Sequence, residues 1–287
     1  MNALQWAIDP WGKLVPIHIA WFLIWVAVIA GLLFFIVHAT FMRYFAKPRQ
    51  FSAEVSPPIA AEIPARVPVH SLVARLYHWI MAAAMFTLLF TAFLPRVGFQ
   101  FPWMTWHWTA GAVLTALVIF HIFHASIWMD FWAIWPDRID MADADHKMRR
   151  FLGRPARPPR KSAKYPLDVK LSHGAFLVAG LTVIVTGVIM MSRVRTIFFP
   201  RNPYLLSDIT WGMIYVLHGL AGVGMIALVM VHIYFGLIRP EFRPYLKAMI
   251  FGWMSRDSYL EEHDPKRWVV EAANSSPESR GGAGNAE

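Results

Sequence analysis

Two stretches with nearly the same pattern decide the fold: H-W-T-A-G-A-V-L-T-A-L-V-I-F-H at residues 107–121 and H-G-L-A-G-V-G-M-I-A-L-V-M-V-H at residues 218–232. They agree at seven of fifteen positions, and each has a glycine four residues after its first histidine. Fourteen residues make nearly four helical turns, so both histidines of a stretch share one helix face, about 21 Å apart along the axis. Ionisable side chains inside apolar helices are costly and therefore indicate a functional site.

The composition around these stretches predicts a membrane protein. The 287 residues are 57% hydrophobic and 16% charged, with a mean hydropathy of +0.42, whereas a soluble domain has about 25% charged residues. The first apolar stretch is too long for a signal-peptide core, so we expect it to remain as an anchor. Five stretches are long enough to cross a bilayer and predict an all-α, polytopic helical bundle: 15–42, 72–95, 106–129, 168–192 and 209–238.

The basic residues predict the orientation of the bundle. Of the 27 lysines and arginines, 22 fall in the connections and tail on one side of the predicted helices and 5 on the other. Because cytoplasmic loops carry the basic excess, the N-terminus is expected in the periplasm and the C-terminus in the cytoplasm, as in a bacterial inner-membrane protein. The net charge of +9 then reflects topology and contact with membrane lipid rather than nucleic-acid binding.

The pattern divides the chain into five parts. We expect an anchor helix in 1–43, a proline-rich cytoplasmic linker in 44–70, a four-helix domain in 71–240, a cytoplasmic segment in 241–271 and a disordered tail in 272–287. Within the four-helix domain, residues 137–166 are expected to form a second cytoplasmic loop. Outside the apolar core, His18 and His38 are expected at the membrane interface, and His70, His146 and His263 in solvent.

The absence of cysteine narrows the chemistry of the site. Disulfides, cysteine-ligated iron–sulfur clusters, thiolate zinc sites and covalently attached haem are all excluded. Neutral histidine remains as an axial ligand, and a flat haem takes one imidazole on each face, supplied by different helices. Two histidine levels about 21 Å apart inside a core about 30 Å thick therefore predict two stacked haems.

The predicted topology sorts the histidines into these two levels. His107 and His218 form an outer level and are expected to share one haem. Internal symmetry alone would pair His121 with His232 for the inner haem. The inner level nevertheless holds four candidates: His78, His121, His173 and His232.

Several of these segments resemble the cytochrome b (gamma) subunit of formate dehydrogenases. R-L-Y-H-W at residues 75–79 is similar to the R-x-x-H-W start of that family, and W-H-W-T-A-G around His107 is similar to its second-helix ligand. The histidine pair of residues 218–232 matches its last helix. The stretch 247–268, K-A-M-I-F-G-W-M-S-R-D-S-Y-L-E-E-H-D-P-K-R-W, is similar to its tail, so that the resemblance covers about residues 70–270.

The resemblance implies a four-helix di-haem cytochrome b core to which this chain adds one N-terminal transmembrane helix. It implies His107 with His218 for the outer haem b and His78, in place of His121, with His232 for the inner haem b. His121 and His173 are additional to that family's pattern, and we expect them at the inner haem or at a quinone site, together with Arg75 and Tyr77.

The same resemblance implies a respiratory role. Electrons would come from an iron–sulfur subunit and a molybdopterin catalytic subunit on the outer face and would reduce quinone near the cytoplasmic face. The chain itself would not act on formate. A cytochrome b of hydrogenase, thiosulfate reductase or another molybdopterin oxidoreductase is the nearest alternative, and a histidine-lined transporter subunit or a membrane anchor protein comes from a different class.

Overall fold

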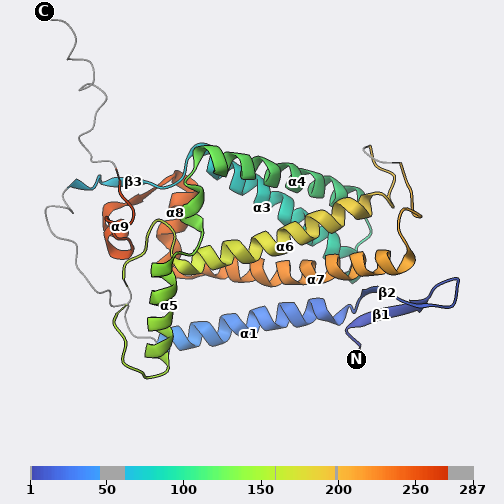
Figure 1. Ribbon diagram of the computed structural model, residues 1–287, viewed down its shortest axis with the longest axis horizontal. Helices are drawn as coiled ribbons and strands as arrows, with labels where there is room; N and C mark the ends of the chain where they lie inside the picture. The colour runs from blue at the N-terminus through green and yellow to red at the C-terminus, as the bar shows by residue number, and fades with distance from the viewer. Residues whose placement is uncertain (1, 46–61, 159, 198–199, 271–287) are drawn as a thin grey trace, which may run out of the picture. The chain divides into compact units, whose positions relative to one another are not determined.

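The computed structural model describes residues 2–45, 62–158, 160–197 and 200–270, which separate into two compact units (Figure 1). The first unit comprises the described residues of Met1–Ala46, Leu76–Met129 and Ser172–Ile238. The second comprises those of Lys47–Arg75, Asp130–Leu171 and Arg239–Glu287. The expected tail 272–287 and most of the expected linker 44–70 lie outside the described residues.

Within the described residues, five helices are long and apolar enough to cross a membrane, which confirms the predicted polytopic bundle. Their exposed side chains are predominantly large and apolar, as expected of a surface that faces lipid. The backbone polar groups of each helix are satisfied within that helix, which a bilayer also requires. The five are α1 (Phe22–Tyr44), α3 (Leu72–Phe93), α4 (Trp103–Trp128), α6 (Leu167–Met191) and α7 (Asp208–Ile233).

The expected start of the first helix at residue 15 is wrong. Residues Leu14–Ile19 form strand β2, which pairs antiparallel with β1 (Leu4–Ile8), and α1 begins only at Phe22. The turn between the strands is fixed by Asp9, whose Oδ1 accepts hydrogen bonds from the backbone N–H groups of Trp11 (2.9 Å) and Lys13 (2.8 Å). Gly12 takes a positive φ of 80° there, which glycine adopts without strain.

The hairpin packs against the first half of α7, and α1 continues along the same helix (Figure 1). Two α7 glycines permit the close approach. A Cβ added at Gly212 would lie 1.7 Å from the carbonyl oxygen of Pro16, and one at Gly219 would lie 2.9 Å from Ile19. Further along, Gly31 of α1 gives the same room to the side chain of Met230. The N-terminal segment is thus fitted to the helix that carries His218 and His232.

Replacing Gly212 should separate the hairpin from α7. Gly212→Val puts a side chain where the Pro16 carbonyl lies, so we expect a lower melting temperature and faster proteolysis within residues 4–19. Gly224→Val is the matched control, because nothing lies within 4 Å of its added Cβ on the same helix. Equal stability and equal proteolysis of the two variants would contradict this packing.

The second unit has a folded core of its own. Strand β3 (Arg66–Pro68) pairs antiparallel with β4 (Trp253–Ser255), which lies between the short helices α8 (Arg243–Phe251) and α9 (Arg256–Glu262). Residues expected to be loop also contain α5 (Arg138–Phe151), which is capped by Asp137. The apolar core consists of Ile63, Val67, Met254 and Tyr259.

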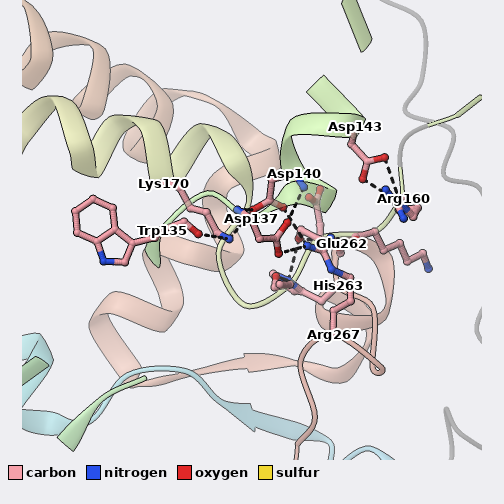
Figure 2. A network of polar contacts seen from close by, with 12 residues as sticks. Trp135, Asp137, Asp140, Asp143, Arg160, Lys170, Glu262, His263 and Arg267 are labelled. Atoms are coloured by element: carbon pink, nitrogen blue, oxygen red, sulfur yellow. Dashed lines mark hydrogen bonds and ion pairs between the residues drawn. The ribbon is translucent and has the colours of Figure 1, made fainter. Parts of the chain in front are cut away.

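A buried ion-pair network connects the start of α5, the start of α6 and the segment after α9 (Figure 2). Asp140 accepts hydrogen bonds from Lys170 Nζ (2.6 Å) and Arg267 Nη2 (3.0 Å), and Arg267 also reaches Asp137 (3.0 Å). Burial raises the pKa of Asp140, but the hydrogen bonds from Lys170, the Asp137 backbone and Arg267 outweigh it and hold the pKa below its usual value. Lys170 and Asp140 are both nearly inaccessible, so loss of Asp140 would leave the buried charge of Lys170 without its acidic partner.

His263 is not in solvent as expected but is fully buried. Its Nδ1 lies 2.8 Å from the carbonyl oxygen of Ala163, its Nε2 lies 3.3 Å from the hydroxyl of Tyr245, and its ring contacts Tyr259 and Trp268. The sequence around it is too polar to signal a core. Burial lowers the pKa of His263 to about 4, although the hydrogen bond to Ala163 opposes this effect.

The buried His263 makes this unit sensitive to acid. The unfolded chain takes up a proton near pH 6.5, whereas the folded chain resists protonation down to about pH 4. Stability is therefore full above the unfolded pKa and falls, by up to about 3 kcal/mol, as the pH drops from 6.5 to 4. Melting temperatures across this range should fall more steeply in the wild type than in His263→Gln. Parallel curves would contradict the assignment.

Candidate histidine-pair site

The first histidine pair joins α4 and α7. The ring centroids of His107 and His218 lie 6.2 Å apart with an interplanar angle of 67°. Each Nδ1 lies at hydrogen-bond distance from a threonine of the preceding long helix: His107 from Thr91 Oγ1 of α3 at 2.8 Å, and His218 from Thr186 Oγ1 of α6 at 2.9 Å. With Nδ1 engaged, Nε2 is the nitrogen left to bind a metal.

The second pair joins α3 and α7. The ring centroids of His78 and His232 lie 6.3 Å apart with an interplanar angle of 47°. Trp79 packs edge-on against His78 at 5.1 Å, and Phe176 packs edge-on against His232 at 5.7 Å. The Nδ1 atom of His78 is buried without a hydrogen-bond partner in the described structure. The structure thus brings His78 next to His232, the pairing that the resemblance implied.

His121 has a different neighbour. Its ring stacks on Tyr77 with the centroids 4.6 Å apart and the planes at 10°. The Tyr77 hydroxyl donates to Met81 Sδ at 3.2 Å, and His173 lies near enough to interact electrostatically with His121. Tyr77, His121 and His173 are each half-buried, so the structure gathers three of the expected inner residues beside the His78–His232 pair.

Arg75, the remaining candidate, belongs to the second unit. There its Nη1 donates to the carbonyl oxygen of Ile250 at 2.6 Å, and its Nε is buried without a partner in the described structure. The guanidinium also lies against Gly252, whose added Cβ would be 3.3 Å from Nε. Its observed contacts are therefore with the end of α8.

Sequence reasoning missed several residues around the pairs. Thr91 and Thr186 lie in apolar helices and carry no recognised motif, although each follows another threonine four residues earlier. Tyr234 is also unforeseen: it begins the π-helical turn Tyr234–Ile238 after α7, and its hydroxyl lies 2.9 Å from His38 Nδ1 of α1. A π-helical turn often accompanies a functional site, and this one begins two residues after His232.

The pair geometry fits iron held between two imidazoles. A metal–nitrogen bond of about 2 Å on each side, added to the two ring radii, places the centroids about 6 Å apart, as both pairs show. Three or more ionisable ligands gathered as for a bare metal ion are absent from the described residues. The arrangement therefore suits a planar macrocycle that supplies the other four ligands and takes one histidine on each face.

Comparison with known proteins agrees with this fit. The family model of prokaryotic cytochrome b561 matches residues 69–252, which include both histidine pairs and both threonines. No curated protein matches the chain significantly. The match covers more than half of the chain, and members of this family are multi-pass membrane proteins that bind haem b and transfer electrons. The chain belongs to the prokaryotic cytochrome b561 family.

Proposed function

We propose that this chain is the di-haem cytochrome b subunit of a membrane-bound formate dehydrogenase and passes electrons from an outer-face partner to quinone near the cytoplasmic face. The observation that carries the di-haem assignment is the pair of ring separations, 6.2 Å and 6.3 Å. Both pairs include a histidine of α7, and these two histidines are fourteen residues apart. One helix thus contributes a ligand to each of two levels.

In this proposal His107 and His218 hold the outer haem, and His78 and His232 hold the inner one. Haem b supplies a one-electron carrier at each level. The chain contributes a neutral imidazole to each face of each haem and apolar helices that exclude water. Ligand type and burial of this kind set the reduction potential of a haem site. A level separation of about 21 Å covers most of a hydrocarbon core about 30 Å thick.

The donor must come from another polypeptide. A chain without cysteine cannot hold the iron–sulfur clusters that connect a molybdopterin site to a membrane haem. We therefore place an iron–sulfur subunit and a molybdopterin subunit on the outer face, beside the His107–His218 level. The tail resemblance over residues 247–268 favours formate as the donor substrate, whereas the family match is equally compatible with a cytochrome b of hydrogenase or thiosulfate reductase.

The inner residues suit a quinone. Reduction of one quinone to quinol consumes two electrons and two protons, so its site needs hydrogen-bonding groups close to an electron carrier. Tyr77 and His121 are in contact, His173 lies near them, and Tyr77 is the chain neighbour of His78. We propose that these three side chains hold the quinone headgroup. Protons drawn from the cytoplasmic side would make turnover electrogenic.

Histidine substitutions test the ligand assignment. In full-length protein purified in detergent, we expect His107→Ala to lose the outer haem, His78→Ala to lose the inner haem, and His121→Ala to retain both, because only the first two face a partner imidazole. The measurement is haem content per chain and the reduced-minus-oxidised spectrum. Loss of a haem in His121→Ala with retention in His78→Ala would reverse the inner assignment, and a wild type without a haem spectrum would favour a transporter.

A donor and acceptor assay tests the remainder of the proposal. Formate added to membranes that contain the native complex should reduce both haems, and a soluble quinone analogue should reoxidise them. The double variant Tyr77→Phe and His173→Ala should keep its haem content and slow the reoxidation at least tenfold, the order of effect expected when positioned hydrogen-bonding groups are lost. Reduction by hydrogen but not by formate would assign the chain to a hydrogenase, and unchanged reoxidation would exclude this quinone site.

A further inference from the structure

The hydrogen bonds at Thr91 and Thr186 fix which ring nitrogen of each outer histidine carries a proton. Thr91 Oγ1 lies 2.7 Å from the carbonyl oxygen of Thr87, which can only accept, so the hydroxyl proton points there. Thr186 Oγ1 lies 2.5 Å from the carbonyl oxygen of Thr182 in the same way. Each hydroxyl oxygen must therefore accept from the histidine. His107 and His218 both carry the proton on Nδ1 and leave Nε2 free for iron.

The two contacts are related by an internal repeat that extends beyond α4 and α7. In α3 the order is Arg75, His78, Thr87 and Thr91, and in α6 it is Lys170, His173, Thr182 and Thr186, with identical spacings throughout. The helix pair α3–α4 and the helix pair α6–α7 are thus two versions of one unit. In both versions, a threonine of the first helix binds the first histidine of the second helix. An accidental contact would not be expected to occur twice in the same register.

Both threonines are shielded from water. Thr91 is 3% exposed and Thr186 is 6% exposed, so no solvent molecule can take the place of either hydroxyl. Beside Thr186, a Cβ at Gly187 would lie 3.4 Å from Cε1 of His218. The ring therefore packs directly against the helix backbone at this point, with little freedom to turn.

The inner level lacks the same support. Nδ1 of His78 is buried and has no hydrogen-bond partner in the described structure. An imidazole that donates its Nδ1–H to an acceptor becomes a more basic ligand, and a more basic ligand stabilises the oxidised iron. Two hydrogen-bonded ligands at the outer level, against at least one ligand without a hydrogen bond at the inner level, would give the two levels different reduction potentials.

We propose that Thr91 and Thr186 are positioning residues that lower the reduction potential of the outer haem below that of the inner haem. The proposal rests on the ligand assignment of the proposed function. It adds a cause for the direction of electron transfer, because the site of lower potential gives electrons to the site of higher potential. Neither threonine touches iron: each acts through the histidine that it holds.

Redox titration of single variants tests this role in the purified full-length protein. Thr91→Val and Thr186→Val keep the side-chain shape and remove the hydroxyl acceptor, while the backbone of Leu88 or Val183 still contacts the ring. Each variant should therefore keep two haems and raise the midpoint potential of the outer haem. At a fixed ambient potential near the midpoint, the oxidised-to-reduced ratio of the outer haem should fall roughly fivefold in each variant. This is the effect expected from losing one hydrogen bond. The midpoint of the inner haem should not move.

The chain provides matched controls on the same helices. Thr87 and Thr182 donate only to the carbonyl oxygens of Ala83 (2.9 Å) and Val178 (2.8 Å) of their own helices. Thr87→Val and Thr182→Val should therefore leave both midpoints unchanged. Equal shifts in the controls, or no shift in Thr91→Val and Thr186→Val with both haems retained, would overturn the role of the threonines while leaving the di-haem assignment intact.

If Thr91→Val loses a haem, the conservative variant Thr91→Ser still tests the proposal. Thr91→Ser restores the hydroxyl without the methyl group, so a return of both haems with the wild-type potential supports the hydrogen bond. Failure of Thr91→Ser to restore the outer potential would show that the methyl packing matters instead, and the proposal would be wrong. Failure of the ligand assignment itself has a separate signature, which is retention of both haems in His107→Ala and His218→Ala.

Discussion

Histidine pairing across helices in an apolar medium is the constraint on which the structure depends. A charged imidazole is costly in hydrocarbon, so these rings stay neutral, and a neutral ring with Nδ1 bound to a threonine presents a bare Nε2 to its partner helix. The pairs His107–His218 and His78–His232 fix the neighbours of α7 at two depths. The fourteen-residue spacing of His218 and His232 places the two pairs nearly four turns apart along α7.

The N-terminal segment lies outside the family match and is fitted to the same helix. The hairpin contacts α7 through Gly212 and Gly219, at the end that carries His218. Helix α1 continues along α7 to Tyr234, whose hydroxyl lies 2.9 Å from His38 Nδ1, two residues beyond His232. The segment therefore supports α7 at both levels. The N-terminal helix thus lies on α7 and contributes to neither histidine pair.

Hydropathy and histidine spacing predicted the parts of the fold that bilayer thickness controls. Hydropathy predicted the five spans, and the fourteen-residue spacing singled out both histidines of α7. The contact between His78 and His232 was predicted by the resemblance, whereas the repeat alone favoured His121. The hairpin was missed because Val15–Ile19 resembles the start of the apolar run that continues into α1, although Pro16 and His18 interrupt that run. The burial of His263 depends on contacts with residues far apart in the chain, which leave no local pattern. The threonines do leave one, since Thr87 with Thr91 and Thr182 with Thr186 recur at the same distances from His78 and His173, but the spacing alone does not show which side chain they contact.

We propose that this chain holds two b haems, each between two histidines. Low-temperature electron paramagnetic resonance of the oxidised, purified protein, combined with haem and protein quantification, tests it most directly. We expect two low-spin ferric signals of bis-histidine type, each integrating to one per chain. A single signal, a high-spin signal or a haem content of one per chain would contradict it.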